Sequence, residues 1–280
     1  LFILIGIYFF LLVYEKKNQN HSKLFFVDFV PPEWHYLYRN NSKYHKKQLP
    51  CPNDKDIILI IGQSNAGNYL LSDNYDTSNL INFYREKCYE ISEPILGSTG
   101  HSKSITSAIA SKILNKKNYI FINNSWAATT ILDWASNKES KLTNFTIREL
   151  EYIVSLGNNL KYVIWIQGES DSVNFSNLDI DQGPLFFSIH GYENYYYEAF
   201  NILRNKITSS FTNKKVKFII TQSTICNTKK NKVINSQKLK LAENENIFLL
   251  PVTDNLDNSY RYDGCHLNEK GVEKTSDEIT

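Results

Sequence analysis

Five short apolar runs, separated by segments with helical spacing, are the feature that most constrains the fold of this chain. The runs are DIILIIG from residue 56, NYIFINN from 118, KYVIWIQG from 161, VKFIITQS from 216 and NIFLLPV from 246. Each is nearly continuous in apolar residues, which is typical of strands buried on both faces. Apolar residues recur at helical spacing in residues 104–117, 145–157, 192–211 and 231–244. This alternation predicts a parallel sheet with helices on both faces.

The chain begins with a different kind of segment. Residues 1–14, LFILIGIYFFLLVY, are apolar and would form about 21 Å of helix, against about 30 Å of bilayer hydrocarbon. This length predicts a signal-peptide core or part of a membrane anchor, with a buried core helix as the alternative. We interpret residues 15–50 as a polar stalk and residues 51–280 as the catalytic domain, located outside the cytoplasm and either secreted or anchored. Lys16 and Lys17 count against a catalytic domain outside the cytoplasm, because basic residues next to an apolar segment prefer the cytoplasmic side of the membrane.

The charge balance and the histidines exclude two classes of partner. The chain has 31 basic and 29 acidic residues, a net charge of +2, and its lysines are scattered along the sequence. This balance gives no general attraction to a phosphate backbone, so we expect no nucleic-acid partner. The six histidines are dispersed, and no His or Cys pair has the spacing of metal ligands. We therefore expect neither a metal nor a cofactor.

Polar residues follow the apolar runs where parallel strands place their functional sites, at the carboxyl ends. GQSN at 62–65 follows the first run, QGESD at 167–171 ends the third, and Asp263 and His266 follow the fifth. Singly, Ser64 could be a helix cap and the Asp–His pair could be turn residues. Together, a serine, a histidine, a nearby aspartate and a spare amide are the groups that acyl transfer requires.

Four ordered blocks resemble a known group of enzymes. They are GQSNAGN at 62, GSTGHSKS at 97, WIQGESD at 165 and RYDGCHLNEKG at 261. From about Cys51 to its end the chain resembles the SGNH (GDSL-like) hydrolases, specifically the sialate O-acetylesterase-like branch of carbohydrate esterases. The resemblance implies a flavodoxin-like three-layer α/β/α sandwich with a five-stranded parallel sheet.

The resemblance also implies catalytic roles. Ser64 corresponds to the nucleophile, His266 to its general base, and Asp263 to the acid that orients the imidazole. The resemblance implies that Glu169 of the QGE block would be a supporting acid, because in some relatives the corresponding Glu assists or replaces the aspartate.

Further residues complete the predicted site. The oxyanion hole would be formed by the backbone N–H of Ser64, that of Gly100, which we favour over Gly97, and the side-chain amide of Gln167. Asn65 and Trp134 are candidate substrate-binding residues, with core packing as the alternative for the tryptophan.

The segment after the second predicted strand departs from the family pattern. Where relatives commonly have Gly-Gly, this chain has Ala127 and Ala128. Because alanine disfavours positive φ, we expect any close approach of the backbone to substrate there to be lost.

The four cysteines can pair fully in an oxidising compartment. Their positions relative to the predicted strands suggest that Cys51 pairs with Cys88 and that Cys226 pairs with Cys265. The second bridge would brace the loop that carries the Asp–His pair. Four buried free thiols are the alternative.

The leading functional hypothesis is an esterase that removes a small acyl group, most simply acetyl, from a carbohydrate hydroxyl through an acyl-serine intermediate. The residues support acyl transfer, and the family resemblance supplies the carbohydrate. Two alternatives stay open. One is transfer of the acyl group to another sugar hydroxyl by the same triad, and the other is an inactive, membrane-tethered glycan-binding protein.

Overall fold

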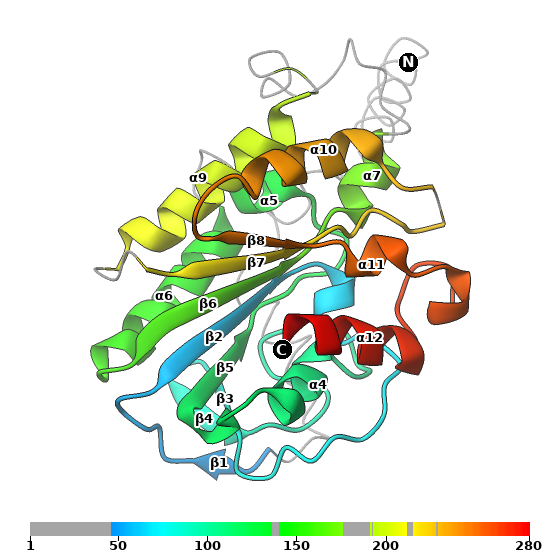
Figure 1. Cartoon of the computed structure of the whole chain (residues 1–280). Coiled ribbons are helices and arrows are strands. Elements are labelled where there is room, and N and C mark those ends of the chain that lie inside the picture. The colour runs from blue at the N-terminus through cyan, green and yellow to red at the C-terminus, as the bar shows by residue number, and fades with distance from the viewer. Residues whose placement is uncertain (1–45, 136–139, 176–190, 192, 212–214, 228) are drawn as a thin grey trace, which may run out of the picture.

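The computed structural model describes residues 46–135, 140–175, 191, 193–211, 215–227 and 229–280 (Figure 1). The predicted N-terminal apolar segment, 1–14, and the stalk up to residue 45 lie outside this range. Within it, no helix is both long enough and apolar enough to cross a membrane.

The described part of the chain forms one sheet of eight strands with helices on both faces (Figure 1). In chain order the strands are β1 (Gln48–Leu49), β2 (Asp56–Gly62), β3 (Ile81–Tyr84), β4 (Lys87–Glu90), β5 (Tyr119–Asn123), β6 (Asn159–Ile166), β7 (Lys217–Thr221) and β8 (Ile247–Leu250). Their order across the sheet is β1-β4-β3-β5-β2-β6-β7-β8. In this order, each pair of adjacent strands from β3 across to β8 is parallel. Strand β4 is antiparallel to both of its neighbours, β1 and β3.

The predicted α/β sandwich is confirmed, and the predicted number of strands is corrected. All five predicted strands form and lie side by side in the order β5-β2-β6-β7-β8. Numbered along the chain they read 2-1-3-4-5, which is the flavodoxin-like order. The sheet extends beyond β5 through β3, β4 and β1, which the sequence did not predict. Their sequences, INFY, KCYE and QL, contain no continuous apolar run.

A two-residue turn joins β3 to β4 without the usual sequence signal. Arg85 and Glu86 both have positive φ, 48° and 60°, as a type I′ hairpin turn requires. Asn-Gly is the pair that normally marks such a turn, so this hairpin is not readable from local sequence. The Glu149 carboxylate accepts a hydrogen bond from the Arg85 backbone N–H at 2.8 Å, which fixes the turn against a helix.

Alternate residues of β2 pack into two separate cores. Ile57, Leu59 and Ile61 face one cluster, and Ile58 and Ile60 face the other. The first cluster is covered by α5 (Ile131–Ala135), α6 (Lys141–Ser155), α9 (Tyr195–Ser209) and α10 (Lys232–Leu241). The second is covered by α4 (Ile105–Lys112) and α12 (Glu269–Ile279). The two helical layers lie on opposite sides of the sheet (Figure 1), and four of these helices, α4, α6, α9 and α10, overlap the predicted helical segments.

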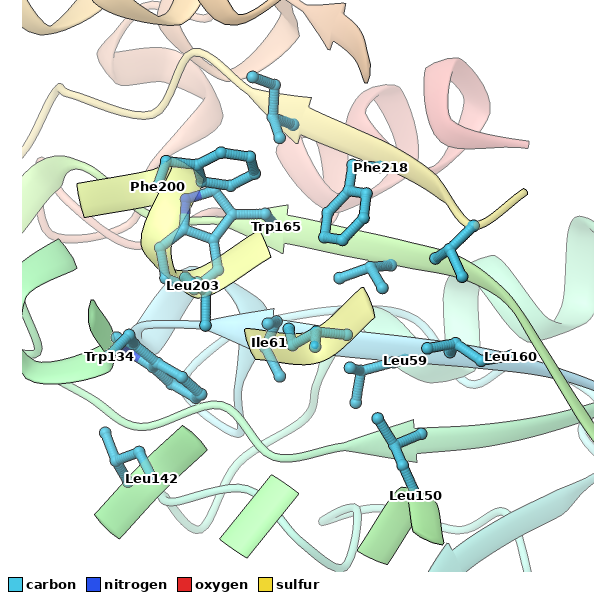
Figure 2. Packing of buried hydrophobic residues seen from close by; sticks show 14 of the residues in the cluster. Leu59, Ile61, Trp134, Leu142, Leu150, Leu160, Trp165, Phe200, Leu203 and Phe218 are labelled. Atoms are coloured by element: carbon cyan, nitrogen blue, oxygen red, sulfur yellow. The ribbon is translucent and has the colours of Figure 1, made fainter. Parts of the chain in front are cut away.

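Aromatic side chains fill part of the first core (Figure 2). Trp165 of β6 packs edge-to-face on Trp134 at 5.6 Å between ring centroids and on Phe200 at 6.0 Å. Such pairs contribute roughly 0.5–1.5 kcal/mol each beyond the area that they bury. Trp134 is fully buried and donates its indole N–H to Thr129 Oγ1 at 3.0 Å. The tryptophan therefore belongs to the core, which corrects its candidate role in contact with substrate.

Both predicted disulfides are present. Cys51 is bonded to Cys88 of β4, which ties the entry of the domain to the added edge of the sheet. Cys226, after β7, is bonded to Cys265 in the loop before α12. The bonded residues are 37 and 39 positions apart, and closing loops of this length typically stabilises a fold by about 2–4 kcal/mol.

Candidate active site

Three segments meet at the carboxyl ends of the parallel strands. The first follows β2 and contains Ser64, and the second follows the neighbouring strand β6 and contains Gln167 and Glu169. The third lies between the short helix η5 (Asn258–Tyr260) and α12, and it contains Asp263 and His266. Hydrogen bonds from a single side chain, that of Asn65, join all three segments.

Ser64 opens the single turn of 3-10 helix η2 (Ser64–Ala66) directly after β2. Gly62 makes this turn possible, because its φ is 140° and a Cβ there would lie 2.0 Å from the carbonyl oxygen of Ile166. Ser64 is 6% exposed, and its hydroxyl forms no hydrogen bond within the described part of the chain. The cap position of this turn is occupied by Gln63, so Ser64 does not act as a helix cap.

Asp263 and His266 form a hydrogen-bonded pair within one turn. Asp263 Oδ2 lies 2.7 Å from His266 Nδ1, while Oδ1 accepts hydrogen bonds from the backbone N–H groups of Cys265 and His266 at 2.9 and 2.7 Å. Partial burial alone would raise the pKa of Asp263, but these hydrogen bonds hold the pKa below its ordinary value. The carboxylate thus stays ionised and holds Nδ1 in its protonated form, so that Nε2 is left to accept a proton.

Asn65 connects the nucleophile segment to the histidine loop. Its Nδ2 donates to the Cys265 carbonyl at 3.1 Å, and its Oδ1 accepts from the Leu267 backbone N–H at 3.1 Å. These two backbone groups flank His266 on either side. Asn65 is fully buried, so the candidate role in substrate contact gives way to one in holding His266 beside the segment that carries Ser64.

Glu169 contacts the same asparagine from the β6 side. Its Oε1 accepts a hydrogen bond from Asn65 Nδ2 at 2.7 Å, and its Oε2 is buried without a partner in the described residues. Burial raises the pKa of Glu169, and the hydrogen bond from Asn65 and the charges of Arg261 and Lys238 oppose that rise. The carboxylate contacts Asn65, while the imidazole Nδ1 is occupied by Asp263.

Two buried cations hold the backbone of the site. Arg261 donates from Nη1 to the Cys265 carbonyl at 2.5 Å and from Nη2 to the Thr253 carbonyl at 2.7 Å. Lys238 of α10 donates to the carbonyls of Gln167 and Thr221 at 2.6 and 2.8 Å. Burial lowers the pKa of Lys238 to about 8, against the opposing effect of nearby carboxylates. Each cation therefore fixes a carbonyl of a residue in the site.

Two of the predicted oxyanion donors are unpaired. Neither the Ser64 nor the Gly100 backbone N–H has an acceptor among the described residues. Gly100 has a φ of 100° and bridges to Asn68, close to the Ser64 segment, and a Cβ there would lie 2.2 Å from the Asn68 carbonyl oxygen. Gly97 is buried, and a Cβ there would lie 2.2 Å from the Asn123 carbonyl oxygen. Gly100 is the less buried of the two glycines, and the choice of Gly100 over Gly97 stays a prediction.

The third predicted donor, Gln167, is engaged elsewhere. It is fully buried, and its Nε2 donates to the Thr129 carbonyl at 3.0 Å and to the Asp171 carboxylate. Its Oε1 accepts from the Tyr196 hydroxyl at 2.9 Å. In this arrangement the amide cannot reach a substrate oxygen, because both of its ends are held inside the protein.

The segment after β5 keeps a backbone shape that its sequence disfavours. Ala128 has a φ of 59°, in the left-handed region that alanine disfavours. Asp171 holds this segment by accepting from the Ile131 backbone N–H at 3.1 Å. Tertiary contacts therefore hold Ala128 in a conformation that alanine disfavours, and the expected loss of a close approach to substrate stays a prediction.

Two tyrosines beside His266 were not predicted as site residues. Tyr69 stacks with the imidazole at 5.7 Å between centroids and Tyr262 at 5.8 Å. Tyr69 lies five residues after Ser64, and Tyr262 directly precedes Asp263. Their closeness in sequence to the catalytic blocks was the one signal that could have identified them.

Comparisons with known proteins identify the family and the fold. The family model described as "Carbohydrate esterase, sialic acid-specific acetylesterase" matches residues 54–279. Among solved structures, a protein of Arabidopsis thaliana has a TM-score of 0.62 and 18% identity, covering 81% of this chain and 98% of that chain. A carbohydrate acetylesterase of Xanthomonas citri has a TM-score of 0.55 and 14% identity, covering 80% of this chain and 54% of that chain.

A third structure, NanS, has a TM-score of 0.51 and 12% identity, covering 81% of this chain and 96% of that chain. At these identities the likeness to solved structures shows the fold alone. No curated protein sequence matches the chain significantly.

Proposed function

The chain belongs to the carbohydrate esterase family of sialic acid-specific acetylesterases, and from this we propose that it removes an acetyl group from a carbohydrate hydroxyl through an acyl-serine intermediate. The observation that best supports the mechanism is the Asp263–His266 pair, 2.7 Å between Oδ2 and Nδ1, which Asn65 holds beside the Ser64 segment. A serine hydroxyl and two backbone N–H groups, all unpaired among the described residues, supply the remaining parts.

In the first half of the proposed reaction, Ser64 Oγ attacks the ester carbonyl while His266 Nε2 takes the hydroxyl proton. Asp263 keeps Nδ1 protonated and stabilises the imidazolium that forms. The backbone N–H groups of Ser64 and Gly100 stabilise the negative oxygen of the tetrahedral intermediate, and each such donor typically contributes about 3 kcal/mol. The sugar oxygen then takes the proton from Nε2 as its bond to the acyl carbon breaks.

In the second half, water attacks the acetyl-serine and gives its proton to His266 Nε2. Collapse of the second intermediate releases acetate and returns the proton to Ser64. Glu169 contributes by holding Asn65, and therefore His266, in place. If a second sugar hydroxyl replaced water in this step, the same residues would perform acyl transfer.

The decisive test compares wild type with Ser64→Ala and His266→Ala on an O-acetylated sialic acid and on an aryl acetate. We expect each variant to lose several orders of magnitude in kcat, and the double variant to lose little more, because the members of a triad act as one unit. Intact-mass analysis of quenched wild type should show one added acetyl group, absent from Ser64→Ala. Near-wild-type turnover by folded Ser64→Ala would refute the mechanism. Adding a sugar acceptor shows whether product forms by hydrolysis or by transfer.

We also propose that the catalytic domain works outside the cytoplasm. Two disulfides support this, because such bonds persist in oxidising compartments. A C-terminal reporter that is active only in the cytosol should therefore stay silent in cells that express the full chain. Strong reporter activity would contradict the proposal.

A further inference from the structure

The imidazole of His266 lies against two aromatic rings. The Tyr69 ring is stacked at 5.7 Å between centroids with 19° between planes, and the Tyr262 ring at 5.8 Å with 22°. The Tyr262 hydroxyl donates to the Tyr69 carbonyl at 2.8 Å, which joins the loop after η2 to the loop before α12. The two rings and the imidazole thus form one connected aromatic group.

The two tyrosines differ in exposure and in what they touch. Tyr69 is half-buried, and a Cβ on Gly100 would come 2.8 Å from its Cε2, so this ring lies close to both the histidine and the proposed oxyanion donor. Tyr262 is 45% exposed, although both of its neighbours in the chain act in the site. An exposed aromatic ring adds little to the core, so packing does not account for an aromatic residue at this position.

The reaction itself determines what comes next to these rings. In the proposed mechanism the leaving oxygen must lie about 3 Å from His266 Nε2 to receive its proton. The sugar that carries this oxygen is therefore beside the imidazole and within reach of a ring stacked on it. The C–H bonds on one side of a sugar ring form an apolar surface, and tyrosine offers a flat apolar face with a polar tip.

We propose that Tyr262, backed by Tyr69, forms a subsite for the sugar ring that bears the leaving hydroxyl. This inference rests on the proposed function and adds the residues that select a carbohydrate as the alcohol part of the ester. Tyr262 is the specificity-determining residue. Tyr69 is the wall that keeps its ring in place through the 2.8 Å hydrogen bond.

The test uses Tyr262→Ala and Tyr262→Phe with two esters, an O-acetylated sialic acid and ethyl acetate, which has no ring. For Tyr262→Ala we expect kcat/KM on the acetylated sugar to fall roughly three- to tenfold more than on ethyl acetate, mainly through KM. Tyr262→Phe keeps the ring and should restore most of the sugar preference. Phe248→Ala is the matched control, because Phe248 is equally exposed at 45% but lies on the edge strand β8.

A second measurement separates the subsite from the chemistry. Binding of free sialic acid is measured by calorimetry in the Ser64→Ala variant and in the same variant that also carries Tyr262→Ala. We expect Tyr262→Ala to weaken this affinity roughly three- to tenfold. Equal losses on both esters, or unchanged binding of the sugar, would overturn the subsite. Wild type that cleaves ethyl acetate but neither cleaves nor binds the sugar would overturn the subsite and leave the acyl-serine mechanism standing. Failure to cleave either ester, with sugar binding that depends on Tyr262, would overturn the mechanism and support the subsite.

Discussion

Glu169 Oε1 accepts a hydrogen bond from Asn65 Nδ2 at 2.7 Å. Through Asn65 this carboxylate is linked to the Cys265 carbonyl and the Leu267 N–H, the two backbone groups that flank His266. A glutamate can therefore support the histidine without touching its ring. This connection explains how both a DxxH aspartate and a QGE glutamate can serve one imidazole.

Glu169→Gln is the variant that separates these two roles. The glutamine oxygen can still accept from Asn65, so we expect kcat to fall by less than about tenfold, with no displacement of the acid limb of the pH profile. Glu169→Ala and Asn65→Ala should each cost more, and together they should cost less than the sum of their separate effects. A severe loss in Glu169→Gln with a displaced pH profile would instead identify Glu169 as the acid behind His266.

Asp263→Asn tests the aspartate without dismantling its turn. The amide oxygen can keep the hydrogen bonds from the Cys265 and His266 backbone, but the amide nitrogen would face Nδ1 and favour the wrong imidazole tautomer. We expect kcat to fall about 10⁴-fold while thermal unfolding changes little. A mild loss here would show that another group orients the imidazole.

The two disulfides should differ in their effect on catalysis. Cys265 carries the carbonyl that Asn65 and Arg261 bind, so replacing both Cys226 and Cys265 by serine should lower kcat at temperatures where the fold persists. The matched control replaces Cys51 and Cys88, which join β4 to the entry of the domain. That variant should lose about 2–5 kcal/mol of stability and keep its kcat below the melting temperature. Equal effects on kcat would remove the special role of the Cys226–Cys265 bridge.

Ala128→Gly should relieve a disfavoured backbone conformation. Left-handed φ costs a non-glycine residue roughly 1–2 kcal/mol, while glycine adds about 0.4–1 kcal/mol of unfolded-state entropy. We therefore expect a gain in unfolding free energy of up to about 1.6 kcal/mol, measured by urea titration. Ala127→Gly is the control, because Ala127 has no positive φ and should lose about 0.5–1 kcal/mol. A lower unfolding free energy in both variants would show that the backbone at Ala128 is not strained.

The catalytic blocks could be predicted from the sequence, but the contacts between them could not. Ser64 and Asp263 were predicted as site residues because each belongs to a short motif that follows a predicted strand, and parallel strands bring their carboxyl ends to one edge of the sheet. The side-chain directions of Gln167 and Asn65 were not readable, because they depend on partners such as Tyr196, 29 residues from Gln167, and Cys265, 200 residues from Asn65. The same limit applies to the added hairpin, whose Arg85–Glu86 turn carries no signal of its own.

The buried network around Gln167 makes the last prediction, which concerns stability and pH. Burial raises the pKa of Asp171 to about 6, although hydrogen bonds from Gln167, Tyr195 and the Ile131 N–H oppose that rise. Because this folded-state pKa lies above the ordinary value of 3.8, the folded protein keeps a proton that the unfolded chain has already released. The contribution of Asp171 to the free energy of unfolding is therefore fully present below the ordinary pKa and is lost as pH rises through about 6.

The variant Asp171→Asn, which does not titrate, isolates this contribution. The free energy of unfolding of wild type, minus that of Asp171→Asn, should fall by on the order of 2–3 kcal/mol between about pH 4 and 7. Urea titrations at several pH values measure this difference, and parallel curves for the two proteins would show that Asp171 titrates at the same pH in the folded and unfolded chains.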